Sequence, residues 1–189
     1  DNSELEMNFG KAEIGFMASG EIRSDHSELT LEKGGRLQIE SEFTQLNLGT
    51  VEDLEVESEG GYIRLDVVQT MEVESELANI TIGYLGEALS AETEFGSLTV
   101  KEVGSDFDNI SVESSKGSIK LVFTDESSFR VTADMELGQI NYPEDKFRIK
   151  NKNTNMTGMS FEGIFGHKDN PQSSVSVEGE FGNIIIEIK

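Results

Sequence analysis

The chain is built from a short unit of alternating strand residues that recurs along nearly its whole length. One copy, residues 71–83, reads MEVESELANITIG, which is two short alternating stretches joined by small residues. The same template occupies residues 37–49, 54–66, 89–101, 110–122 and 175–187. Self-similarity at a short, nearly fixed period is typical of solenoids, in which each repeat buries its apolar side against its neighbours. This repeat limits the fold more than any other property of the sequence.

The period is set by the residue that closes the first strand of each copy, which we term the corner residue. The first five corner residues are 17 residues apart, and the next intervals are 18, 21, 19, 26 and 20 residues. The ten predicted corner residues are Phe9, His26, Phe43, Gly60, Leu77, Phe95, Lys116, Met135, Phe161 and Phe181. An interval of 17 residues is too short for two strands and a helix, so the sequence predicts an all-β, single-chain solenoid.

The predicted solenoid forms one domain, residues 1–189, of about ten turns with 17–21 residues each. Connections between parallel strands of one sheet are overwhelmingly right-handed, so we expect a right-handed coil. A β-sandwich of hairpins is the alternative, because similar alternating strands occur there. The fixed spacing and the shared corner favour the solenoid.

Alternation within each copy predicts which side chains face the core. Leu54, Val56 and Ser58 share one side of a strand, and the intervening glutamates occupy the other. Two inward columns of mainly β-branched and aliphatic residues follow, as a buried pleated surface requires. The first column is predicted to hold Ile39, Val56, Val73, Ala91, Val112, Val131 and Val177. The second is predicted to hold Ala12, Leu29, Leu46, Ile63, Ile80, Leu98, Ile119, Ile140, Ile164 and Ile184.

The bend of each turn is predicted at the residue after the corner residue. Leu77 is expected to fill the core and Ala78 to form the corner, and small residues recur at the position of Ala78. Small residues let the backbone bend sharply without a clash at Cβ. The positions concerned are Gly10, Ser27, Thr44, Gly61, Ala78, Gly96, Gly117 and Gly182.

Two segments depart from the regular repeat. Residues 143–160 are predicted to be an insertion or loop, within which Lys146, Arg148, Lys150 and Lys152 form the basic face of an edge strand. The last turn, residues 181–189, is almost wholly apolar. Because a solenoid needs its ends covered, this turn is expected either to be capped by the chain itself or to meet a partner or a second copy.

Composition limits the classes of partner. The net charge is −22, with 37 acidic and 15 basic residues, which argues against nucleic acid, because phosphate backbones are bound through lysine and arginine. There is no cysteine, so a disulfide or thiolate metal site is excluded. The sequence starts at Asp1 without an initiator methionine, which favours removal of an upstream segment and an extracytoplasmic location: periplasmic, cell-surface or secreted. A membrane tether upstream of the chain is a further expectation.

The outward glutamates are the strongest candidates for chemistry. A solvated acidic face is the favoured interpretation, with weak divalent-cation binding, a structural calcium site and a paired-carboxylate hydrolase as alternatives. No calcium-loop pattern or isolated carboxylate pair stands out, so no catalytic, cofactor-binding or metal-ligating residue is predicted. The predicted outward residues are Glu55 and Glu72, then Glu40, Glu57, Glu74, Glu92, Glu113 and Glu178, then Glu42, Glu59, Glu76, Glu94 and Glu180.

The two histidines do not form a zinc-ligand pair, because His26 and His167 fall in different turns. His26 occupies a corner position, where packing is expected rather than catalysis or metal binding. His167 lies in a polar run before Pro171 and is expected to be exposed.

The repeated pattern of an apolar residue, Val-Glu-Ser, a glycine and an alternating apolar stretch resembles bacterial adhesin families of unknown function. The resemblance rests on residues 73–75 with 78–82, and on residues 93–100, 113–121 and 178–186. It extends to the head domains of autotransporter-like adhesins and to a type linked to an envelope-stress operon. It implies a single-chain β-helix, exported or membrane-tethered, without an established enzymatic activity, and it supplies no catalytic residues.

These observations together predict a cell-envelope module that binds or supports rather than catalyses. An adhesin-like module would present its flat stacked faces to a protein or glycan partner. The alternatives are an envelope-stress or scaffold protein that docks another bacterial protein, and a polysaccharide-acting β-helix enzyme.

Overall fold

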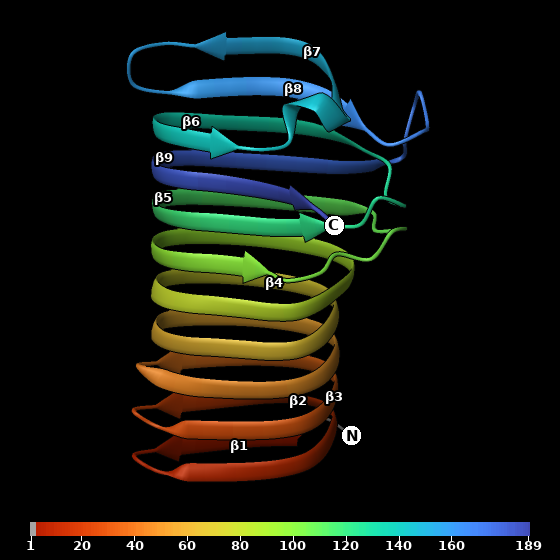
Figure 1. The fold of residues 1–189 in the computed structure, drawn as a ribbon. Coiled ribbons are helices and arrows are strands. Elements are labelled where there is room, and N and C mark those ends of the chain that lie inside the picture. The colour runs from red at the N-terminus through yellow and green to blue at the C-terminus, as the bar shows by residue number, and fades with distance from the viewer. Residues whose placement is uncertain (1–2) are drawn as a thin grey trace.

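The chain winds into a stack of flat turns in which successive repeats lie side by side (Figure 1). A computed structural model describes residues 3–189, so Asp1, on which the expectation of export rests, lies outside the described residues. The elements are β1 (Ser3–Asn8), β2 (Lys11–Asp25), β3 (Glu28–Glu42), β4 (Thr44–Val100), β5 (Asn109–Phe123), β6 (Phe129–Asn141), the 3₁₀ turn η1 (Glu144–Lys146), β7 (Phe147–Thr154), β8 (Met159–Phe165) and β9 (Ser173–Ile188). The predicted β-solenoid is confirmed.

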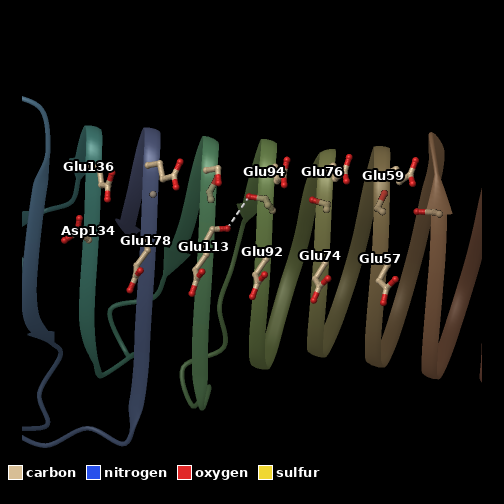
Figure 2. A pocket seen from close by; sticks show the side chains of 18 of the residues that line it. Glu57, Glu59, Glu74, Glu76, Glu92, Glu94, Glu113, Asp134, Glu136 and Glu178 are labelled. Atoms are coloured by element: carbon tan, nitrogen blue, oxygen red, sulfur yellow. Dashed lines mark hydrogen bonds between the residues drawn. The ribbon is translucent and has the colours of Figure 1, made fainter.

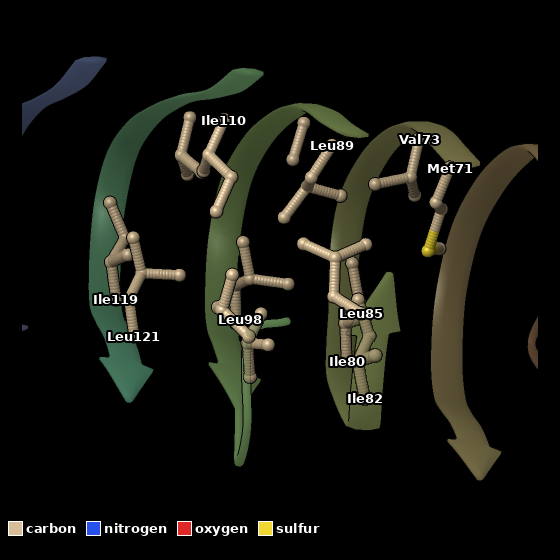
Figure 3. Packing of buried hydrophobic residues seen from close by; sticks show 14 of the residues in the cluster. Met71, Val73, Ile80, Ile82, Leu85, Leu89, Leu98, Ile110, Ile119 and Leu121 are labelled. Carbon is tan, nitrogen blue, oxygen red and sulfur yellow. The ribbon is translucent and has the colours of Figure 1, made fainter. Parts of the chain in front are cut away.

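Successive turns pair in parallel and in register, which builds the predicted inward columns. Leu29 lies beside Leu46 across β3 and β4, and Leu98 lies beside Ile119 across β4 and β5. These residues are at most 1% exposed. Figure 3 shows the same repetition in the middle of the stack, where aliphatic side chains from successive turns fill one continuous interior. A stack of this kind buries one thin core along its whole length.

The order of the strands in space differs from their order in the sequence. The sheet runs β1-β2-β3-β4-β5-β9-β6-β8-β7, so β9 is inserted between β5 and β6 (Figure 1). Val177 of β9 pairs with Val112 on one side and with Ala133 on the other. The expectation that the last turn forms an end of the solenoid is therefore wrong. Its apolar residues Ile184 and Ile186 are buried between neighbouring turns of the same chain.

The register also corrects the alignment of the repeat in β6. Leu137, not Met135, is the corner residue of this turn, because Leu137 lies beside Phe181. The first inward column accordingly contains Ala133 in place of Val131. Phe161 and Ile164 belong to neither a corner nor an inward column of parallel turns. They lie in β8, which runs antiparallel to β6.

The corner residues point outward, contrary to the prediction. Leu77 is 51% exposed, whereas Ala78 is completely buried. Alternation is broken at corners such as this one, where the two consecutive residues Glu76 and Leu77 face solvent before Ala78 turns inward, whereas the corner residue Gly60 is buried. The backbone supplies the reason: Phe43 has a positive φ of 45° at its corner, as do Phe9 and His26 at theirs. In three later turns the positive φ is at the glycine after the corner residue: Gly61, Gly96 and Gly182.

The end of the stack that holds β6 is covered by an antiparallel hairpin. β8 pairs with β6, and β7 pairs with β8 and forms the last strand of the sheet (Figure 1). Beneath the hairpin, Phe129 packs against Phe123 and Phe165 with ring centroids 4.4 and 5.3 Å apart. The predicted basic edge strand within residues 143–160 is thus β7, in which Arg148 and Lys150 are exposed. Charged residues on an edge strand hinder pairing with another chain.

The glycine that follows the corner in several turns is required because it touches the backbone of the neighbouring turn. A Cβ added to Gly182 would lie 1.8 Å from the carbonyl oxygen of Gly117, and one added to Gly138 would lie 1.9 Å from that of Gly182. Gly182 also has a φ of 132°, which side chains rarely adopt. Close stacking of the turns therefore excludes larger residues at this position.

We predict that Gly182→Ala lowers the free energy of unfolding by about 1–3 kcal/mol or more, because it adds both a backbone clash and strain at positive φ. Gly15→Ala is the matched control, since a Cβ there would meet nothing within 4 Å. Urea unfolding of the two variants, followed by circular dichroism, measures the difference. Equal stability of the two variants would contradict this account of the corner.

Candidate binding surface

The outward glutamates form two parallel rows that border a long open groove of ≈ 1020 Å³ (Figure 2). Thirteen carboxylates line this groove, which we term the acidic groove, and no basic residue does. The first row is Glu40, Glu57, Glu74, Glu92, Glu113, Glu178 and Asp134. The second row is Glu42, Glu59, Glu76, Glu94, Glu180 and Glu136, with Ser115 between Glu94 and Glu180.

The sequence missed two members of these rows. Asp134 lies beside Glu178, and the same register puts Glu136 beside Glu180. Both were missed because the sequence alignment placed the corner residue of β6 at Met135, two residues before its true position at Leu137. Gly138 could have corrected the alignment, because it follows Leu137 as Gly182 follows Phe181. The remaining predicted residues of the two rows lie where the sequence placed them.

The acidic groove carries almost no compensating charge. Glu40 receives a hydrogen bond from Arg23 Nε at 3.1 Å, whereas none of the other twelve carboxylates forms an ion pair within residues 3–189. The charge of Glu21, followed by the hydrogen bond and the charge of Glu40, raises the pKa of the Arg23 guanidinium above its ordinary value. Arg23 therefore supplies the only ion pair to a groove carboxylate within residues 3–189, at Glu40.

The outward corner residues form a second feature beside the groove, which we term the corner ridge. In stack order it comprises Phe9, His26, Phe43, Gly60, Leu77, Phe95, Lys116, Phe181 and Leu137. Six of the nine exposed large apolar side chains in the described part of the chain belong to it, with exposed fractions from 41% to 76%. Single exposed apolar residues are ordinary, but an aligned series is a mark of an interaction surface.

Several neighbouring side chains of the ridge contact one another from turn to turn. The ring of His26 lies between those of Phe9 and Phe43, with centroid separations of 5.2 and 5.5 Å. The Phe43 ring also covers Gly60, where an added Cβ would lie 3.1 Å from the ring. Further along, the Lys116 ammonium lies 4.8 Å from the centre of the Phe95 ring. The ring positions are therefore fixed by their neighbours.

The two histidines both lie on the surface of the domain. His26 packs at its corner as predicted, between Phe9 and Phe43, but on the outside of the coil, where its side chain is 50% exposed and its Nδ1 is hydrogen-bonded to Asp25. His167 is exposed, as predicted. Neither lies in the acidic groove.

The groove has the geometry of a repeated surface, not of a single reaction centre. Equivalent residues of adjacent turns in a parallel sheet are about 4.8 Å apart, so each carboxylate faces its neighbours along a line and does not converge on a point. Within residues 3–189, no group of three or more acidic or histidine side chains is arranged to hold a metal ion. All the groove carboxylates except the half-buried Glu40 are exposed. Such a surface suits electrostatic recognition.

Comparison with known proteins gives one family. A sequence model of the Toastrack DUF4097 family matches residues 13–187, which is nearly the whole chain and includes every turn of the acidic groove. The chain belongs to the Toastrack DUF4097 family. No curated protein and no solved structure gives a significant match. Toastrack domains have a β-solenoid-like fold, and the family is uncharacterised, so membership supports the architecture of the domain and assigns no activity.

We predict different responses from two glutamates of the Toastrack groove. Glu76→Gln should raise the free energy of unfolding by up to about 1 kcal/mol at low salt, because Glu59 and Glu94 flank it at about 4.8 Å without a cation. High salt should remove this gain by screening. Chemical denaturation at both salt concentrations measures it.

Glu40→Gln is the matched control, because it removes a carboxylate that is bonded to Arg23. We expect no gain in the free energy of unfolding, because the substitution relieves repulsion within the row but also removes an exposed ion pair, which contributes little. A gain of the same size for both variants would show that only net charge matters and that the local arrangement of the rows does not.

Proposed function

We propose that this Toastrack domain is a non-catalytic, adhesin-like binding module that acts outside the cytoplasm at a bacterial cell envelope. The main support is the corner ridge, whose six exposed Phe and Leu side chains lie along one edge of the stack. Burying these residues on a partner would be favourable by the usual hydrophobic gain for apolar surface removed from water. The proposed partner is a protein or a glycan at the cell surface.

The repetition of the surface supports binding over catalysis. A reaction needs one site in which a few groups have distinct roles and environments, and paired carboxylates work through such a difference. The carboxylates of the acidic groove repeat from turn to turn and are solvated. A partner that extends along the stack can use many equivalent contacts at once, and its total affinity then comes from their number.

A scaffold protein that docks another bacterial protein was the alternative expectation, and its proposed contact was the apolar last turn. An end-on contact through this turn has little support, because β9 lies inside the stack and Ile186 is 1% exposed, whereas Phe181 of the same turn is 45% exposed and lies on the corner ridge. Any such docking would have to use the exterior, where the corner ridge is the largest aligned apolar feature.

No helix in the described residues could span a membrane.

We predict that the purified domain binds components of arrays of surface glycans and cell-surface proteins, and that Leu77→Ser, Phe95→Ser and Phe181→Ser combined weaken this binding by about tenfold or more. These residues are 41–51% exposed, so the triple variant should remain folded, which circular dichroism can verify.

Phe16→Ser is the control, since Phe16 is 68% exposed but lies off the ridge. It should leave binding unchanged. Binding that is absent from both arrays would count against the proposed module, and binding that survives in the ridge variant would move the contact to another face.

A further inference from the structure

The corner ridge and the acidic groove adjoin each other along the stack. In six turns a groove carboxylate immediately precedes a ridge residue in the sequence, as Glu76 precedes Leu77 and Glu94 precedes Phe95. Both members face solvent in five of these pairs, and in the sixth Gly60 is buried beside the exposed Glu59. A partner that covers the ridge therefore brings its own flank within reach of the carboxylates.

Negative charge flanks the ridge on one side only. On the groove side, twelve unpaired carboxylates lie in two rows. On the other side, the outward positions two residues beyond the corner are uncharged in seven successive turns of the stack. These positions hold Gln45, Tyr62, Asn79, Ser97, Ser118, Asn183 and Gln139. A matching partner must carry positive charge along one flank of an apolar stripe.

From this arrangement we propose that the ligand of the surface is a basic amphipathic helix of a polypeptide partner, laid lengthwise on the corner ridge with its cationic flank over the acidic groove. The inference rests on the proposed binding function and names its partner class. Charge complementarity selects the basic flank, and the exposed Phe and Leu residues select the apolar stripe. A small cation or polyamine would neutralise the rows but leave the ridge in water.

The dimensions suit a helix. The nine ridge positions span eight turn-to-turn intervals of about 4.8 Å, or ~38 Å in all. A helix rises 1.5 Å per residue, so about 25 residues cover the ridge. Amphipathic helices present their apolar residues as a stripe along one side, and binding of this stripe to an apolar surface is a common mode of peptide recognition. The carboxylate rows would speed association and make it depend on salt.

The test uses the whole domain and a synthetic leucine–lysine helix of about 25 residues with one apolar stripe. Binding is followed by fluorescence anisotropy at low and high salt. The comparison peptides are a scrambled sequence of the same composition, a leucine–glutamate version and poly-L-lysine. Of the four peptides, we expect only the amphipathic basic helix to bind tightly and to lose affinity when the ridge residues are substituted. Its affinity should fall by at least about tenfold at high salt.

Three variants separate the contributions. Leu77→Ser, Phe95→Ser and Phe181→Ser together should weaken binding of the basic helix by about tenfold or more. Glu59→Gln, Glu76→Gln and Glu94→Gln together should do the same and should reduce the dependence on salt. The net-charge control is Glu52→Gln, Glu102→Gln and Asp106→Asn together, which lie outside the groove and should have a much smaller effect.

Each contrary result overturns the inference. Equal loss in the groove variant and the net-charge control would indicate attraction by total charge alone. Binding of poly-L-lysine as tight as that of the amphipathic helix, with no effect of the ridge variant, would indicate an indifferent polyanionic surface. If the basic helix does not bind while the arrays yield a glycan whose binding needs the ridge, the proposed function stands and this partner class is wrong.

Discussion

The structure depends on the close parallel stacking of one turn on the next. Each turn presents a row of backbone groups that only an equally shaped neighbour can pair with, and an unpaired buried polar group is costly. The approach is closest at the residue after the corner, where Gly182 lies between the carbonyl of Gly117 and the backbone of Gly138. Because this contact admits only a small residue, the small residues keep the turns in register. The inward columns and the outward rows follow from that register.

The same contact explains why the corner residue faces outward. The residue after it must turn inward to meet the neighbouring backbone, so the corner residue and the glutamate before it both remain outside. Phe43 and its two preceding equivalents hold this geometry themselves at positive φ, where a side chain other than that of glycine is uncommon. Their stacked rings then partly cover one another. The exposed ridge is therefore a consequence of how the coil bends.

Much of this could be predicted from the sequence, because the 17-residue interval and strict alternation fix both the coil and its inward columns. Ile63 and Ile80, for example, are buried as alternation requires. The corner could not be predicted in this way, since alternation assumes an unbroken pleat and the bend inserts a second outward residue, as at Leu77. The order of the strands in the sheet could not be predicted from the repeat pattern either. β5, β6 and β9 carry the same template, so the pattern allows each to pair with either of the others, whereas the structure places β9 between β5 and β6 and the β7–β8 hairpin beyond β6.

The distribution of charge distinguishes the acidic groove from the rest of the surface by degree. Some carboxylates outside the groove, such as Glu28, Asp53 and Glu187, are paired with lysine or arginine, although others, such as Glu52 and Glu102, form no ion pair within residues 3–189. No basic residue lines the groove, and apart from the pair of Glu40 with Arg23 the repulsion between carboxylates of neighbouring turns is left uncompensated. A surface selected only to stay in solution would gain stability from interspersed charges of both signs. Keeping one sign beside an aligned apolar ridge costs stability in the free domain. The proposed basic partner would offset this cost, because each basic group it contributes would relieve the repulsion along the rows.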